Sequence, residues 1–262
     1  MPDPPRIDGR EAARFLRSDM TPSPLDQSDS VSLGADPHLP DPLPADPFPL
    51  FHQWFQDARE GKVQPNPNAF TLATIDPDGR PSARVVLCKG LSLPSGYVVF
   101  YTNRLGRKGR ALEANPRAAA VFHWDDLDRQ ARMEGLVTRS PEEESDAYFN
   151  SRPWISRLGA WASNQSEPVE GRAALKAQLD EVFRRFGLNP NNPPARDAQI
   201  TIPRPPHWGG YRLWADRVEL WVGGTGRLHD RARWSREVRM VTGPAGSTCE
   251  VSPGWVRSRL QP

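Results

Sequence analysis

Hydrophobic and polar positions alternate along much of the chain with the period of two that is typical of half-buried β-strands. Asp76-Pro-Asp-Gly79 separates the first two apolar runs, and its Pro and Gly favour a tight turn, so we expect these runs to form a hairpin. Short strands joined mainly by hairpins and interrupted by a few helices predict a mainly β fold with appended helices, an antiparallel barrel. The predicted strands cover residues 70–75, 82–89, 96–102, 118–124, 130–137, 211–214, 218–222, 238–241 and 255–260.

Helical spacing of apolar residues occurs in fewer places. Leu50, Phe51, Trp54 and Phe55 predict a helix that faces the core, and a short helix near 108–115 stops before a proline. Ser140-Pro-Glu-Glu143 predicts a helix start with Ser140 as its capping residue. A second amphipathic helix is expected at 173–186, with Gly187 ending it and one apolar stripe formed by Leu175, Leu179, Val182, Phe183 and Phe186.

Proline is the compositional outlier. The chain has 29 prolines, and 11 of them lie in the first 50 residues. The segment 21–49 is rich in Pro, Asp and Ser, so we expect it to be extended or disordered and to stay outside the packed core. The predicted organisation is therefore a disordered segment 1–42 followed by one folded domain, 43–262.

Charge and cysteine content exclude several classes of protein. The net charge of +2 gives no reason to expect nucleic acid or a membrane as a partner. Cys88 and Cys249 are too few for a disulfide framework and lack the spacing of a zinc site, so we expect no metal. The first residues show no secretory signal pattern, and no apolar run is long enough to span a bilayer, which favours a cytoplasmic protein.

Two groups of cationic and hydroxyl side chains suggest phosphate binding. Tyr148 and Arg152 are four residues apart on the predicted helix and Ser156 follows just past Pro153, which suits a phosphate cradle, although a solvated helix end fits the same spacing. The strand from Arg84 to Lys89 carries a cation at each end, but strict alternation would place them on opposite faces.

A second phosphate is suggested by Arg107-Lys108, where the start of a helix would add backbone N–H groups. Taken alone, such a pair is more often a surface charge pair. The chain has no Gly-rich dinucleotide fingerprint, Walker motif, nucleophile elbow or metal-ligand spacing, which disfavours NAD, ATP, serine-hydrolase and zinc chemistry.

Several motifs follow one another along the chain: Arg84-Val-Val-Leu-Cys-Lys89, Phe100-Tyr-Thr-Asn103, Arg107-Lys-Gly-Arg110, Arg129-Gln130, Tyr148-Phe-Asn-Ser-Arg-Pro153, Gly159-Ala-Trp-Ala-Ser163, Gln165-Ser166, Trp208-Gly-Gly-Tyr211, Arg227-Leu-His-Asp-Arg231 and the closing Arg259-Leu-Gln-Pro262. In this order they resemble the pyridoxine/pyridoxamine 5′-phosphate oxidase family, from about residue 43 to residue 262. The resemblance implies a split β-barrel, a homodimer with its C-terminal dimerisation region, and two FMN sites at the subunit interface.

The same resemblance implies FMN-dependent oxidation of pyridoxamine and pyridoxine 5′-phosphate to pyridoxal 5′-phosphate, with O2 as acceptor and H2O2 released. It assigns Lys89, Tyr148, Arg152 and Ser156 to the substrate phosphate. Arg227 and His229 are the implied catalytic residues over the pyridine ring, although His229 could instead be purely structural. The implied FMN contacts are Arg84, Val85, Val86, Leu87, Cys88, Lys89, Tyr101, Thr102, Arg107, Lys108, Gln130, Gln165, Ser166, Trp221 and Arg231.

Three features depart from the family pattern. The family has a basic, tyrosine-containing N-terminal lid, for which this chain offers only Arg14 and Arg17 as counterparts. Cys88 replaces a leucine and is expected to be a buried hydrophobe. The segment 242–252 is expected to be an enlarged hairpin loop. Two alternatives remain open. One is a related flavin oxidase of phenazine-type biosynthesis, and the other is a flavin- or pyridoxal-phosphate-binding protein without turnover.

Overall fold

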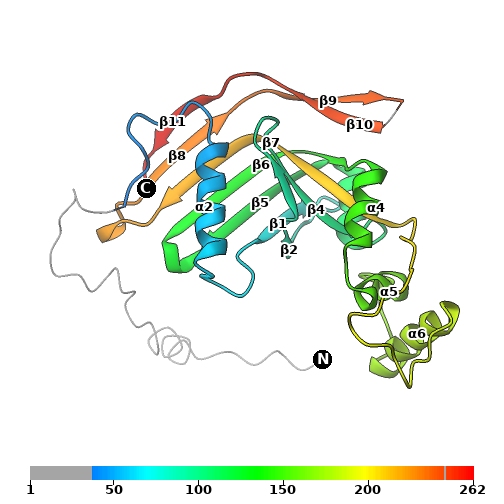
Figure 1. Cartoon of the computed structure of the whole chain (residues 1–262). Coiled ribbons are helices and arrows are strands. Elements are labelled where there is room, and N and C mark those ends of the chain that lie inside the picture. Colours follow the sequence, from blue (N-terminus) through cyan, green and yellow to red (C-terminus); the bar gives the residue numbers. More distant parts are fainter. Residues whose placement is uncertain (1–36, 245) are drawn as a thin grey trace, which may run out of the picture.

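The computed structural model describes residues 37–244 and 246–262, and it is built around one large antiparallel sheet (Figure 1). Nine strands of the described chain join in the order β11-β8-β7-β6-β5-β1-β2, with β4 also pairing with β7 and β3 pairing with β4. The predicted mainly β, antiparallel architecture with appended helices is confirmed. The strands are β1 (Ala69–Ile75), β2 (Pro81–Leu87), β3 (Gly90–Ser92), β4 (Tyr97–Asn103), β5 (Arg117–Trp124), β6 (Arg129–Arg139), β7 (Trp208–Val222), β8 (Asp230–Ser235) and β11 (Val256–Leu260).

The long strand β7 corrects the prediction of two separate strands at 211–214 and 218–222. Its first half pairs with β4 and its second half with β8, while β6 runs along its other edge. A β-bulge shifts the register between Glu134 and Gly135 of β6. A Cβ at position 135 would lie 1.8 Å from the carbonyl oxygen of Trp214, so only glycine allows the two strands to stay paired at this point.

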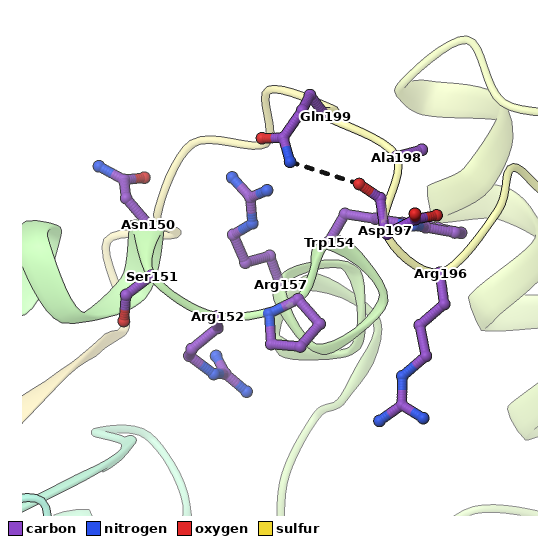
Figure 2. A pocket seen from close by; sticks show the side chains of 10 residues that line it. Asn150, Ser151, Arg152, Trp154, Arg157, Arg196, Asp197, Ala198 and Gln199 are labelled. Carbon is purple, nitrogen blue, oxygen red and sulfur yellow. Dashed lines mark hydrogen bonds between the residues drawn. The ribbon is translucent and has the colours of Figure 1, made fainter.

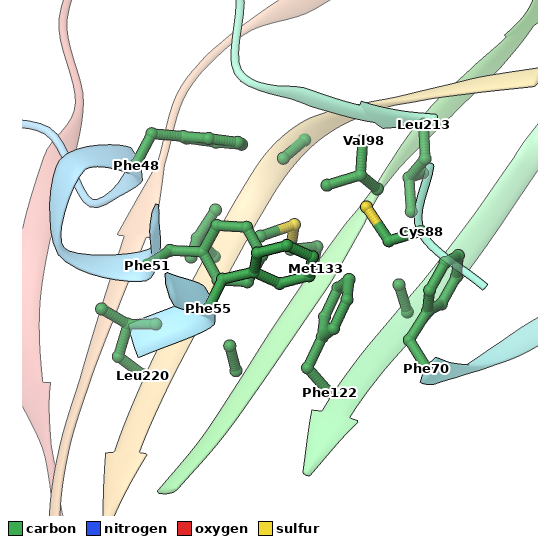
Figure 3. Close-up of a cluster of buried hydrophobic side chains, with 14 of the residues drawn as sticks. Phe48, Phe51, Phe55, Phe70, Cys88, Val98, Phe122, Met133, Leu213 and Leu220 are labelled. Atoms are coloured by element: carbon green, nitrogen blue, oxygen red, sulfur yellow. The ribbon is translucent and has the colours of Figure 1, made fainter. Parts of the chain in front are cut away.

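The hydrophobic core lies between the sheet and α2 (Phe48–Glu60), which crosses the sheet in Figure 1. Phe51 of α2 contacts Phe122 of β5 with ring centroids 5.2 Å apart, and Phe122 contacts Phe70 of β1 at 4.9 Å. These rings lie between the helix and the sheet in Figure 3 and contact one another edge-on or tilted. The predicted core-facing helix is confirmed, and it extends beyond the predicted 48–55.

Four further α-helices of the described chain connect strands of the sheet. Helix α3 (Arg107–Ala114) lies between β4 and β5 in the chain, and α4 (Glu142–Asn150), α5 (Trp154–Ala162) and α6 (Arg172–Arg185) lie between β6 and β7. Helices α5 and α6 form a second, smaller core through Trp154, Leu158 and Phe183. Helix α5 was not predicted. In α6, Leu175 of the predicted apolar stripe is 49% exposed, because the packing against α5 begins further along the helix.

Ser140 does not cap α4 as predicted. Helix α4 begins at Glu142 with Pro141 as its N-cap residue and no side-chain cap. The backbone N–H of Ser140 still donates to the carbonyl oxygen of Gly210 in β7, so this residue continues the strand instead of turning into the helix.

Residues just before the predicted domain boundary are packed against the fold. Leu39 is fully buried, and its backbone N–H donates to Oδ2 of Asp230 at 2.8 Å. The carbonyl oxygen of Pro40 accepts a hydrogen bond from Arg259 of β11. The expectation that 21–49 stays out of the core is therefore wrong for its last part. The rest of the predicted disordered segment, with Arg14 and Arg17, lies outside the described residues.

The expected loop at 242–252 is instead mostly a hairpin. Strands β9 (Val238–Gly243) and β10 (Gly246–Val251) pair as a separate two-stranded sheet, which projects beyond the main sheet in Figure 1. Among the described helices, none combines the length and the apolar character needed to cross a membrane.

Candidate functional site

A cavity of about 500 Å³ lies where β2 and β4 meet the turn between α4 and α5. It brings together most of the residues that the sequence assigned to two separate phosphates. Of the predicted residues it is lined by Arg84, Val85, Val86, Leu87, Lys89, Tyr101, Thr102, Lys108, Tyr148, Arg152, Ser156 and Gln165. Further lining residues, which lie in the family motifs but were assigned no ligand from the sequence, are Asn103, Gly159, Ala160, Ser163 and Trp208.

Arg84 and Lys89 line the same cavity, although strict alternation would place them on opposite faces. Strand β2 ends at Leu87, and the backbone N–H of Lys89 donates to Val99 of β4, so the alternation does not continue to Lys89. Cys88 between them points into the core and is 4% exposed. Burial raises the pKa of its thiol to about 11, so this cysteine is a buried, protonated hydrophobe as predicted, and its side chain is turned away from the cavity.

At one end of the cavity, Arg84 and Lys108 form a cationic centre. Lys108 Nζ donates to Gln165 Oε1 at 2.6 Å and to Thr102 Oγ1 at 3.2 Å. Arg84 Nη1 donates to Thr74 Oγ1 at 2.8 Å. Burial lowers the pKa of both cations, and the charge of Arg84 adds to the effect on Lys108. Within the described chain neither has a carboxylate oxygen within 4.0 Å, so this centre is suited to an anionic ligand.

Arg107 and Ser166 lie at the margin of this centre and do not line the cavity. Arg107 Nε donates to Asp76 Oδ2 at 2.8 Å, and its backbone N–H donates to Ser166 Oγ at 3.1 Å. The hydrogen bond from Arg107 lowers the pKa of the Asp76 carboxyl group. The Arg107 guanidinium is thus already partnered by a carboxylate, unlike Arg84 and Lys108.

Three aromatic rings stack beside the cavity. The rings of Tyr101 and Tyr148 are 4.1 Å apart, and Trp208 stacks on Tyr101 at 5.5 Å with an interplanar angle of 10°. Lys89 Nζ lies 5.9 Å from the Tyr148 ring centroid, and Arg152 Cζ lies 4.8 Å from that of Trp208. We call Lys89 and Arg152 the second cationic centre of the cavity, and cation–π contacts orient both side chains.

Arg152 lies beyond the end of α4, so it does not share a helix face with Tyr148 as the spacing suggested. The turn at Pro153 nevertheless brings Tyr148, Arg152 and Ser156 to one cavity. Arg152 Nη1 is buried without a hydrogen-bond partner, and burial lowers the pKa of the guanidinium, with the nearby charge of Arg157 adding to this effect. An unpaired buried donor of this kind is what an anionic ligand would satisfy.

A neighbouring cavity, also of about 500 Å³, shares Arg152 with the first. Figure 2 shows that Arg152 and Arg157 extend from the start of α5 in different directions. Arg157 is therefore a chemically matched arginine next to the main cavity that does not line it.

The remaining predicted residues form a second group at the far end of β7. Gln130 of β6, Trp221 of β7 and Arg231 of β8 are direct cross-strand neighbours. The His229 ring lies 4.7 Å from that of Trp221, and its Nδ1 accepts from the backbone N–H of Gly224. Arg227 precedes it in the same connection, with a positive φ of 63°.

The two groups do not meet within one chain. Trp208 lines the cavity, and Trp221 lies 13 residues further along the continuous strand β7. At the rise of a β-strand, this separation is roughly 40 Å along the strand. One small ligand in the cavity therefore cannot contact both groups of the same chain.

Two family models cover most of the folded chain. The model described as "Pyridoxamine 5'-phosphate oxidase" matches residues 59–186, and the one described as "Pyridoxine 5'-phosphate oxidase C-terminal dimerisation region" matches 208–262. The chain belongs to the pyridoxamine 5′-phosphate oxidase family. It is 49% identical over 230 residues to a pyridoxine/pyridoxamine 5′-phosphate oxidase of Rubrobacter xylanophilus, covering 87% of this chain and 89% of that protein. It is 48% identical to one of Burkholderia lata, covering 83% and 89%.

Solved structures place the fold among the split barrels of this oxidase family. PhzG of Burkholderia lata, in complex with tetrahydrophenazine-1-carboxylic acid, superposes with a TM-score of 0.69 at 29% identity, covering 85% of this chain and 95% of that one. A pyridoxamine 5′-phosphate oxidase-related, FMN-binding protein of Nostoc punctiforme superposes with a TM-score of 0.54 at 16% identity, covering 78% and 97%. The predicted split-barrel fold is confirmed.

Proposed function

We propose that this protein is an FMN-dependent oxidase that converts pyridoxamine and pyridoxine 5′-phosphate to pyridoxal 5′-phosphate. The observation that carries the proposal is a single cavity with two separate cationic centres, Arg84 with Lys108 and Lys89 with Arg152, one for each of two phosphates. The relatives from Rubrobacter xylanophilus and Burkholderia lata, at 49% and 48% identity, are named as oxidases of these substrates.

The residues present fit FMN. Arg84 and Lys108 form a half-buried cationic centre in which neither cation has a carboxylate oxygen within salt-bridge distance, which suits the flavin phosphate. The buried Nε of Arg231 also lacks a hydrogen-bond partner, so a donor is available in the second group. When bound, FMN would supply the redox chemistry: it would take a hydride from the substrate, and O2 would then take up two electrons and two protons to give H2O2.

The chain's own residues would bind and orient the substrate. Arg152 can offer the substrate phosphate two parallel N–H donors, and Lys89 adds a compact charge from the same cavity. Tyr148 and Ser156 can add hydroxyl donors from the same cavity. Arg227 and His229 would hold the pyridine ring, with His229 able to move a proton.

A homodimer is part of the proposal. The roughly 40 Å of strand between Trp208 and Trp221 prevents one chain from supplying both groups to one ligand. In a two-fold dimer, the second group of each subunit can complete the cavity of the other, which gives two equivalent sites. The match of 208–262 to a dimerisation region supports this arrangement.

The direct test is an assay of the purified full chain. We expect a yellow protein that carries FMN and that forms pyridoxal 5′-phosphate and H2O2 in equal amounts from pyridoxine 5′-phosphate under air. A flavin-loaded protein that forms neither product would support the alternative of a binding protein without turnover.

Selectivity for the cofactor is a further expected result. Arg84 and Lys108 provide one cationic centre at the phosphate end of the flavin site, which matches a single monophosphate. We therefore expect FMN to bind much more tightly than FAD in a fluorescence titration. Equal affinities for the two flavins would contradict the assignment of this centre.

Flavin affinity should also fall at alkaline pH. Burial and the charge of Arg84 lower the pKa of Lys108 below its ordinary value of 10.5. The protonated amine is the form that attracts a phosphate. FMN affinity should therefore be highest at pH values below the lowered pKa of Lys108 and should decrease as the pH rises through that pKa. Titrating FMN into the flavin-free chain at a series of pH values measures this loss. Lys108→Arg should move the loss to higher pH, and an unchanged profile would remove Lys108 from the phosphate contact.

The superposition on PhzG favours a second candidate, oxidation of a tricyclic precursor such as tetrahydrophenazine-1-carboxylic acid. This acid has no phosphate, so the centre formed by Lys89 and Arg152 would lack its proposed ligand. Comparing turnover of the two substrates separates the candidates. Faster oxidation of the tricyclic acid than of pyridoxine 5′-phosphate would favour the second.

A further inference from the structure

A buried carboxylate lies in the second group of residues. Glu219 of β7 is 5% exposed, and its two oxygens are bound by arginines of the neighbouring strands. Arg231 Nη2 of β8 lies 2.6 Å from Glu219 Oε1, and Arg132 Nη2 of β6 lies 3.1 Å from Glu219 Oε2. No role for Glu219 followed from the sequence.

Strand register explains why these side chains meet. Glu219 is directly opposite Arg132, and Trp221, two residues further along β7, is directly opposite Arg231. Side chains two residues apart on a strand lie on the same face, so Glu219, Trp221 and Arg231 share one face of the sheet. Val218 and Leu220, the residues on either side of Glu219, are fully buried in the core on the opposite face.

The bridge leaves Arg231 partly satisfied. Nη2 is held by Glu219, and Nη1 makes a long contact of 3.4 Å with the carbonyl oxygen of Gln261. Nε is buried and has no hydrogen-bond partner in the described chain. The guanidinium is therefore held in one orientation with a donor that remains to be satisfied.

We propose that Glu219 is a positioning residue for flavin binding: it holds the Arg231 guanidinium in the orientation in which its free donor meets the flavin bound by a partner subunit. The proposal rests on the proposed function. Glu219 would act only through Arg231 and would not contact the flavin.

Positioning can be separated from simple charge neutralisation by the sign of its effect. If Glu219 only neutralised Arg231, its removal would leave a freer positive charge and would strengthen the binding of an anionic cofactor. If it orients Arg231, its removal allows the guanidinium to take other rotamers and weakens binding.

The test uses the full chain purified with FMN, with dissociation followed by the recovery of free-flavin fluorescence on dilution. Glu219→Gln removes the charge and keeps the shape, and we expect FMN to bind roughly tenfold more weakly, the lower end of what the loss of a supporting residue costs at a bound group. Glu134→Gln is the matched control. Glu134 lies on β6, on the same face of the sheet as Glu219, and it contacts Arg132 and Arg217 but not Arg231. The control should keep wild-type affinity.

A double-mutant cycle distinguishes a positioning role from a merely structural one. In an Arg231→Gln background, Glu219→Gln should have little further effect on FMN dissociation, because the group through which it acts is already gone. An equal effect in both backgrounds, or unchanged or tighter FMN binding by Glu219→Gln alone, would overturn the proposal. Failure of the proposed function would look different, because the wild-type chain would then bind no FMN, or would bind it without forming pyridoxal 5′-phosphate, whatever the effect of Glu219→Gln on flavin affinity.

Discussion

Replacing Arg152 by alanine is expected to weaken the binding of pyridoxine 5′-phosphate by about 2 kcal/mol or more, the range of charge-assisted hydrogen bonds. This corresponds to a rise of about 30-fold in the Michaelis constant. Arg152 is held over Trp208 and has a buried Nη1 without a partner, so its donors are already oriented for an anion. Steady-state kinetics with pyridoxine 5′-phosphate and with unphosphorylated pyridoxine measure the effect.

The loss should be confined to the phosphorylated substrate. FMN content should remain near normal, because Arg84 and Lys108 form a separate cationic centre. Arg157→Ala is the matched control, since this arginine lies on the next turn of the chain and does not line the main cavity. A wild-type Michaelis constant for the phosphate ester in Arg152→Ala, or loss of the flavin, would show that Arg152 has another role.

The alternating pattern predicted the fold class because each strand of the barrel has one face in the core and one outside. It failed where polar residues interrupt a strand. Ala215-Asp216-Arg217 appeared to separate two strands, yet the backbone carbonyl of Asp216 accepts from the Arg236 N–H and that of Ala215 from Arg236 Nε. These contacts from Arg236, which is distant in the sequence, support the continuous strand β7, and the hydrophobic periodicity of the sequence does not report them.

A single apolar residue also gives no periodic signal. Leu39 lies in a Pro- and Asp-rich stretch whose composition predicts disorder, but it is fully buried and tied to Asp230. This contact joins residues 191 positions apart, so it depends on the tertiary fold. Composition describes the average of a segment and cannot identify the one residue that packs.

Most of the predicted residues that line the cavity were named because they lie in the motifs that carry the family resemblance, and their roles in binding stay predictions. What spacing could not provide was the orientation of individual side chains. Lys89 joins Arg84 in one cavity because β2 ends before it, and Trp208 was assigned no ligand although it belongs to a motif that carries the resemblance. Glu219 was likewise assigned no role, since alternation places it on the outer face, where a glutamate is ordinarily solvated. Its burial comes from the long side chains of Arg132 and Arg231 on the neighbouring strands.

Two inactive variants are expected to restore each other's activity when they assemble together. Arg152→Ala damages the cavity, and Arg227→Ala damages the second group at the far end of β7. Each alone should turn over little pyridoxine 5′-phosphate at concentrations well below the wild-type Michaelis constant. When the two chains are co-expressed in equal amounts, half of the dimers should contain one chain of each kind, and one of the two sites in each such dimer should be intact. The expected recovery is therefore about one quarter of the wild-type activity.

This recovery depends on the shared site and on nothing else in the proposal. If each chain completed its own site, both damaged residues would still leave every site defective, and the mixture would be no more active than the average of the two variants. A double variant carrying Arg152→Ala and Arg227→Ala in one chain, co-expressed with the wild-type chain, provides the control. Its mixed dimers have one intact cavity facing a damaged second group and the reverse, so they should contribute almost no activity, and only wild-type dimers should remain active. Wild-type dimers make up about one quarter of this mixture, so it should also show about one quarter of the wild-type activity. Sites completed within one chain would instead give about half of the wild-type activity here and almost none in the first mixture, and that outcome would contradict the requirement for two chains that the length of β7 implies.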